Sequence, residues 1–159
     1  MSDILNLLLV STWESIYMVF SSVAIATFFG IPLGVLLFVT DKQQFLKSDI
    51  LNEILSWIVN IIRSIPFVIL LILLLPFTKL IVGKAIGTTA AIVPLSIAAV
   101  PLVGRLTENA LREVPKGVIE AAQSMGASPF QIITKVLLPE SLPSIVSGIT
   151  ITTINLVGY

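Results

Sequence analysis

The sequence contains neither cysteine nor histidine among its 159 residues. It therefore lacks disulfides, thiol chemistry and the usual zinc ligands, and no histidine is available for a Ser-His-Asp triad. Charge is also scarce, at 11% of residues against about 25% in a typical soluble domain. Nine basic residues balance nine acidic ones, so there is no basic surplus for nucleic acid. We expect no catalytic residue, no metal, no cofactor and no nucleic-acid partner.

Two further signals are missing. No GxxxxGK[ST] loop is present. The most similar segment, Gly83-Lys84-Ala85, has no Ser or Thr after the lysine and lacks the upstream glycine of the motif. The chain is therefore not expected to bind ATP by a P-loop. No Lys or Arg precedes Lys42, so the N-terminus lacks the positive region of a signal peptide.

What the chain does have is apolar length: 56% of its residues are hydrophobic and the mean hydropathy is +1.06. The uncharged run from Ser15 to Thr40 would reach about 39 Å as a helix, more than the roughly 30 Å of a hydrocarbon core. We expect one all-α membrane domain over 1–159, a multi-pass helical bundle with spans at about 15–40, 64–82, 85–104 and 141–159. Kinks or breaks are expected at Pro66, Pro76 and Pro94.

Residues 49–63 carry a different pattern. Polar side chains recur there at helical intervals, namely Asp49, Asn52, Glu53, Ser56, Asn60 and Arg63, and apolar residues fill the remaining surface. This pattern predicts an amphipathic helix that either lies at the membrane interface or faces a polar cleft.

The segment 105–140 holds eight of the chain's charges, and its longest uncharged run would reach only about 21 Å. A charge at the centre of a span costs about 2.5–3.5 kcal/mol, so we expect this segment to stay outside the hydrocarbon core. Of the nine Lys and Arg residues, six fall on its side of the predicted spans and two on the other, with Arg63 left out of the count. The positive-inside rule therefore places the loop in the cytoplasm and the N-terminus outside.

Within this loop the local signals predict two helices separated by a turn. Pro115 suits a first helical turn, and Gly126 suits the left-handed position that ends a helix. Ser128 with Gln131 forms a capping-box pattern for a second helix, which is expected to end before Pro139. A hairpin that merely covers the ends of the spans is an equal alternative. A DNA-binding helix-turn-helix is disfavoured because only Lys116 and Lys135 could meet phosphates.

The spacing in this loop matches a known pattern. Glu120-Ala121-Ala122 is followed by three residues, Gly126, nine residues, Val136, one residue and Leu138-Pro139. This resembles the EAA loop of ABC importer permeases, with Val in place of Ile as the one departure. The segments RSIPF (63–67), AAIVPL (90–95), ENAL (108–111) and QIITKVLLPESLP (131–143) are similar to methionine-importer permeases. The likeness runs from about residue 10 to 159.

The resemblance implies a type I ABC importer permease fold with a cytoplasmic coupling helix. Such permeases have five spans, so the last is expected to be absent from this sequence, which is still apolar at Tyr159. The coupling loop implied to contact the ATPase comprises Glu120, Ala121, Ala122, Ser124, Met125, Gly126, Ala127 and Ser128. The Ala residues would permit close approach of a partner, and Glu120 would meet its cations or backbone donors.

The same resemblance implies the partners. These are two copies of an ABC ATPase, a second permease copy in a homodimer, an extracytoplasmic methionine-binding lipoprotein and the lipid of a bacterial inner membrane. The permease would be no enzyme itself, because hydrolysis would belong to the ATPase, and its substrate would be methionine.

Several residues within or beside the spans are candidates for a pathway or gate. Arg63 would line the cytoplasmic mouth of a pathway, hold a gate closed or anchor its span at the headgroups. Pro66, close behind Arg63, is a second candidate. Asn155 is a polar group in the predicted fourth span, near Thr150, Thr152 and Thr153. The polar side chains of this span either face a pathway or form hydrogen bonds to neighbouring helices or to their own backbone. Gly30 and Gly34 form a GxxxG that we assign to packing within the chain rather than to a dimer face.

Other functions remain as alternatives. A permease for a different amino acid has similar RSIP-type motifs. A secondary transporter would need acidic residues inside a span, and Glu14 and Glu140 lie only at the edges. A scaffold without transport would not need the ordered EAA spacing.

Overall fold

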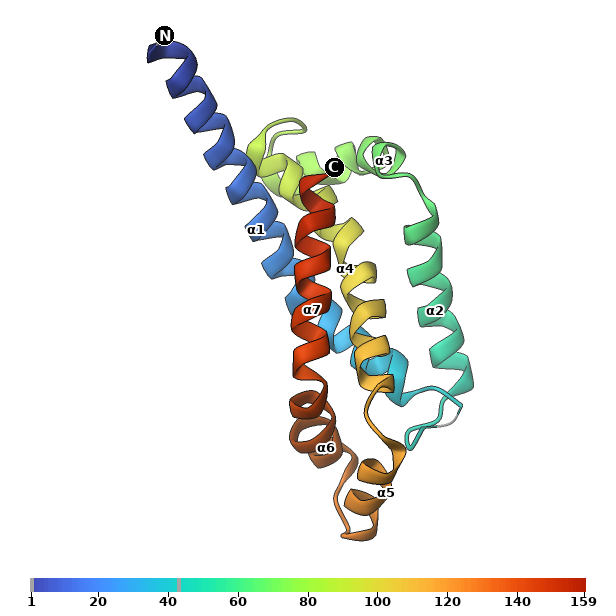
Figure 1. Cartoon of the computed structure of the whole chain (residues 1–159). Helices are drawn as coiled ribbons and strands as arrows, with labels where there is room; N and C mark the ends of the chain where they lie inside the picture. Colours follow the sequence, from blue (N-terminus) through green and yellow to red (C-terminus); the bar gives the residue numbers. More distant parts are fainter. Residues whose placement is uncertain (1, 43) are drawn as a thin grey trace.

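The computed structural model describes residues 2–42 and 44–159, and within them the only regular structure is helical. The predicted all-α class is confirmed. Figure 1 shows long helices running side by side, with α5 and α6 gathered at one end of the bundle. The elements are α1 (Ser2–Val39), α2 (Asp49–Ser64), α3 (Phe67–Val82), α4 (Thr88–Arg112), α5 (Lys116–Ser124), α6 (Pro129–Ile132), the π-helical turn η1 (Ile133–Leu137) and α7 (Leu138–Val157).

The centre of the fold is the packing of α1 against α4, which is closest at two glycines. A Cβ atom on Gly30 would lie 2.6 Å from the Val103 side chain, and one on Gly34 would lie 2.5 Å from the backbone oxygen of Gly104. Only residues without a side chain fit there, because helix backbones that approach so closely leave no room for one. The GxxxG therefore serves packing within the chain, as the sequence predicts.

By length and composition, three helices of the described chain can cross a membrane: Ile4–Val39, Thr88–Arg112 and the continuous stretch Pro129–Val157. A fourth span is possible only if α2 and α3 are counted together. These two helices meet at an angle of 107°. In Figure 1, α2 runs along the bundle, whereas α3 lies across its end. The segment 64–82, predicted as one span, is thus mostly the short helix α3, and α2 is the helix that runs along the bundle.

The prolines act differently from one another. Pro66 is the N-cap of α3 and stands at the sharp bend, as predicted. At Pro76 and Pro94 the helices do not break, because α3 and α4 continue through both residues, and the alternative of a kink there stays a prediction. Membrane helices tolerate such prolines because neighbouring helices and hydroxyl groups compensate for the lost hydrogen bond.

The segment 105–140 is continuous with long helices at both ends. Its first residues continue α4 to Arg112, and Thr107, Glu108 and Leu111 are buried within the protein. At the other end, the second helix of the pair does not stop before Pro139. It passes through η1 into α7, and Pro139 lies at the start of α7, directly after the π-helical turn.

Candidate functional site

The hairpin of α5 and α6 is built by local signals that act as predicted. Gly126 adopts a φ of +78°, a left-handed conformation that other residues rarely take, and so ends α5. Ser128 then caps α6: its hydroxyl accepts from the Gln131 backbone N–H over 3.4 Å, and its own N–H donates to the Gln131 side chain over 2.9 Å. The turn is therefore held by backbone geometry and capping.

The inner face of the hairpin is anchored in an apolar core. Ile119 and Ala122 of α5 pack with Ile132 of α6 and with Leu137. The same cluster includes Phe38 and Val39 at the end of α1, and Leu111 and Val114 at the end of α4. This packing attaches α5 to the ends of the two long helices α1 and α4.

The outer face of the hairpin is open. Of the residues predicted to contact an ATPase, Glu120, Ala121, Ser124, Met125, Gly126 and Ser128 are exposed, and Ala127 is half-buried. Met125 is the most prominent, with 82% of its surface accessible. Ala122 differs, because it is only 4% exposed and faces the core. Its small size lets α5 approach the other helices, so Ala122 positions the hairpin and does not belong to the open face.

Beside the hairpin lies a cluster of charges that the sequence analysis missed. Glu108, only 4% exposed, accepts hydrogen bonds from Arg105 and from Arg112, each over 2.7 Å. Arg105 also reaches the Asn60 side chain on α2 over 3.2 Å, and Arg112 reaches Asp41 after α1 over 2.8 Å. The cluster thus joins α1, α2 and α4. The spacing of Arg105, Glu108 and Arg112 at i+3 and i+4 was the signal available in the sequence.

The charges around Asp41 alter its acidity. Burial alone would raise the pKa of this carboxyl group, but the Arg112 hydrogen bond and the Lys42 backbone N–H, together with their positive charges, outweigh that effect. The pKa of Asp41 is therefore lowered, and the carboxylate remains charged at neutral pH. It can accordingly hold Arg112 at the start of the hairpin.

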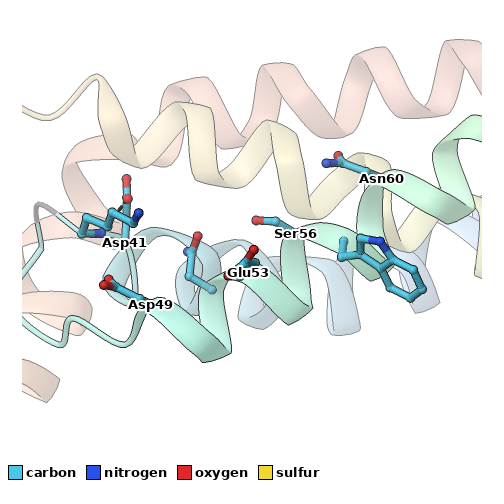
Figure 2. Close-up of a pocket in the computed structure, with 8 residues that line it drawn as sticks. Asp41, Asp49, Glu53, Ser56 and Asn60 are labelled. Carbon is cyan, nitrogen blue, oxygen red and sulfur yellow. Dashed lines mark hydrogen bonds between the residues drawn. The ribbon is translucent and has the colours of Figure 1, made fainter.

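The polar side of α2 faces a cleft, which is the second of the two alternatives that its pattern allowed. Asp49, Asn52, Glu53, Ser56 and Asn60 line a cavity of about 430 Å³, together with Asp41, Lys42 and Trp57. Figure 2 shows Glu53, Ser56 and Asn60 following one another along the helix, with Asp41 and Asp49 at one end. Asn52 also fixes α2 to α1 by donating to the Leu37 carbonyl over 2.7 Å.

The structure brings two of the three pathway candidates together. Arg63, in the last turn of α2, and Asn155, on α7, line one cavity of about 270 Å³, and Pro66 stands at the adjoining bend. This end of α2 adjoins α3, whereas α5 and α6 lie at the opposite end of the bundle (Figure 1). Arg63 therefore does not lie beside the hairpin, as a cytoplasmic mouth there would require, and its other two alternatives, a gate or an anchor at the headgroups, stay predictions. Thr150, Thr152 and Thr153 bond to their own backbone, at 2.8–2.9 Å.

Comparison with known proteins gives a consistent result. Residues 30–159 match the family described as binding-protein-dependent transport system inner membrane component. The chain is 56% identical over 154 residues to the probable D-methionine transport system permease protein MetI of Vibrio cholerae, covering 97% of this chain and 68% of that protein. It is 52% identical over 153 residues to the D-methionine transport system permease protein MetI of Escherichia coli K12, covering 96% and 70%.

Solved structures give the same result for the fold. A chain from the inward-facing MetNI methionine ABC transporter superposes with a TM-score of 0.96 at 52% identity, covering 100% of this chain and 74% of that one. A chain from an amino acid ABC transporter with histidines superposes with a TM-score of 0.70 over 97% of this chain. At 19% identity, the second match supports the shared fold alone.

Proposed function

Because the chain belongs to the family of inner membrane components of binding-protein-dependent transport systems, we propose that it is the permease subunit of an ATP-driven importer for methionine. The observation that carries this proposal is its high identity, over nearly its whole length, to permeases named for D-methionine transport. The EAA spacing around Glu120 supports the same assignment, because that loop is what a permease needs to engage an ATPase.

In this proposal the hairpin is the coupling element. A cleft on the ATPase receives the exposed residues of α5 and the following turn, with Glu120 meeting cations or backbone donors of the ATPase. Closure of two ATPase subunits on ATP moves α5. The apolar contacts of Ile119 and Ala122, and the salt bridge of Arg112 with Asp41, pass that movement to α1 and α4. Hydrolysis itself belongs to the partner.

The assembly we propose contains two copies of this permease and two of the ATPase, with a methionine-binding lipoprotein on the outer side. The chain lies in the bacterial inner membrane, with the hairpin in the cytoplasm and the N-terminus outside. The excess of Lys and Arg on the hairpin side supports this orientation. We place the pathway along the polar side of α2, with Arg63, Pro66 and Asn155 near its far end.

Uptake into proteoliposomes tests the proposal. The permease, its ATPase and the binding protein would be reconstituted, and accumulation of labelled methionine would be followed with and without ATP. We expect uptake that requires ATP and that persists when ionophores collapse the ion gradients. Uptake driven by an ion gradient without ATP would identify a secondary transporter and reject the proposal.

The substrate is tested in the same vesicles. Unlabelled D- and L-methionine are expected to compete with the label, whereas other amino acids at equal concentration leave uptake nearly unchanged. If another amino acid competes more strongly than methionine, that amino acid is the substrate. The assignment of the chain as a permease would not change.

A further inference from the structure

The cavity that holds Arg63 and Asn155 has no assigned role. It lies where the bend between α2 and α3 meets the middle of α4 and the end of α7, and its volume is about 270 Å³. Its walls are apolar on the side of α4, at Ala98 and Leu102, and aromatic at Phe67 and Tyr159. Two exposed polar side chains from helices distant in the sequence therefore share one small cavity whose other lining residues are mainly apolar or aromatic.

Arg63 has a charge that the described part of the chain does not neutralise. Its side chain is exposed, and no acidic residue lines the cavity. By contrast, Arg105 and Arg112 both bond to Glu108, so this protein does pair its arginines where they are structural. A guanidinium presents two parallel donors that match a carboxylate, and a lone cation beside apolar spans favours an anion.

Asn155 supplies the second polar group. Among the described residues its side-chain amide has no hydrogen-bond partner in the fold, whereas the hydroxyls of Thr150, Thr152 and Thr153 are each occupied by the preceding turn of α7. The amide oxygen of Asn155 is thus free to accept a hydrogen bond from an ammonium group. A carboxylate and an ammonium side by side are the two ends of a zwitterionic amino acid.

An apolar space adjoins this cavity. A neighbouring cavity of about 510 Å³ shares Phe67, Leu156 and Tyr159 with it and is lined mainly by apolar side chains, among them Val19 and Leu95. The rings of Phe67 and Tyr159 lie 4.5 Å apart between the two spaces. Aromatic edges make favourable contacts with thioether sulfur, so this wall suits an apolar, sulfur-containing side chain.

We propose that these two cavities form a substrate site within the permease, in which Arg63 binds the α-carboxylate of methionine and Asn155 its α-ammonium group. The thioether side chain enters the apolar cavity and contacts Phe67 and Tyr159. The inference rests on the proposed function, and it gives the permease a selectivity of its own in addition to that of the binding protein.

Equilibrium binding of labelled methionine to the purified permease–ATPase complex, without the binding protein, tests the site. Arg63→Gln is expected to weaken binding at least tenfold, Arg63→Lys to weaken it less, and Asn155→Ala to weaken it severalfold. Lys79→Gln is the matched control, because Lys79 is an exposed cation of the adjacent α3 that lies outside the cavity lining. It should bind as the wild type does.

Methioninamide, which lacks the carboxylate, separates substrate contact from a merely structural role. In the wild type, methioninamide should compete with labelled methionine at least tenfold less well than unlabelled methionine does. In Arg63→Gln the two compounds should compete equally well, because only Arg63 binds the carboxylate. The proposed site is rejected if Arg63→Gln binds methionine as the wild type does, or if the wild type shows no saturable binding. In either case, ATP-driven methionine uptake by the same wild-type complex would still support the proposed function. A wild type that neither binds nor transports methionine rejects both.

Discussion

At the scale of single residues, Gly34 shows how closely two helices of this bundle approach. Its missing side chain is what allows the backbone of α1 to lie against the Gly104 carbonyl of α4. A backbone oxygen cannot rotate away as a side chain can, so this contact tolerates no added atom without movement of a helix.

Gly34→Ala is therefore expected to destabilise the permease. The added Cβ would lie 2.5 Å from the Gly104 oxygen. Overpacking of this kind costs about 1–3 kcal/mol, which exceeds the roughly 1 kcal/mol that alanine gains over glycine in a helix. Thermal unfolding in detergent, followed by circular dichroism, would show a lower midpoint.

Gly117→Ala is the control for this substitution, since nothing lies within 4 Å of a Cβ at Gly117 in α5. Its unfolding midpoint should stay the same or rise. Equal midpoints for Gly34→Ala and the wild type would contradict the close packing of α1 on α4.

At the scale of elements, Glu108 connects helices that apolar packing alone would leave free to slide. Its buried carboxylate holds Arg105 toward α2 and Arg112 toward the segment after α1. Without Glu108, Arg105 has no acidic partner, whereas Arg112 keeps Asp41. Breaking a fully buried ion pair costs about 3–5 kcal/mol, and the partial exposure of both arginines places this loss at the lower end.

Glu108→Ala is accordingly expected to lower the free energy of unfolding by about 3 kcal/mol. Glu113→Ala provides the comparison: this exposed glutamate follows α4 and accepts a hydrogen bond from Ser144, so its loss should cost about 1 kcal/mol. Denaturant titration of both variants measures the difference. Similar losses in the two would mean that the cluster does not hold the helices together.

The coupling helix α5 makes a separate prediction. Glu120→Ala should leave the permease folded and inserted, because Glu120 is exposed and faces away from the core. Methionine uptake should fall at least tenfold, while the complex no longer increases ATP hydrolysis in response to loaded binding protein. Glu140→Ala, which alters an exposed glutamate on α7, should transport normally. Normal uptake by the Glu120 variant would refute the coupling role.

At the scale of the whole molecule, the proposed orientation places the two ends of the bundle in different compartments. The chain has no cysteine, so single cysteines can be added without interference. Met125 at the hairpin and Ile86 between α3 and α4 are both strongly exposed, at 82% and 84%. They report on opposite ends of the helices in Figure 1.

In intact spheroplasts that express the permease without its ATPase, a membrane-impermeant maleimide should label Ile86→Cys but not Met125→Cys. Met125→Cys should react once the membrane is opened. Labelling of residue 125 in intact spheroplasts would show that the topology is the reverse of the proposed one. The hairpin would then lie outside the cell, where a cytoplasmic ATPase cannot bind it.

Local signals determined much of this protein. Long apolar runs predict α1, α4 and α7, and Gly126 and the Ser128–Gln131 pair predict the hairpin, because each depends on residues adjacent in the chain. The polar stripe of α2 likewise predicts an amphipathic helix, and the structure selects the cleft from the two surroundings that the stripe allowed.

Only the tertiary structure decided the rest. The burial of Glu108 and of Ala122, and the meeting of Arg63 with Asn155, depend on contacts between helices far apart in the sequence. Pro66 itself predicts a break, but the angle of 107° does not follow from hydropathy, which measures how apolar a segment is and carries no information about its direction. Charge by itself placed the segment of Glu108 outside the hydrocarbon core, but it did not show that two arginines on the same helix pair with Glu108 inside the bundle.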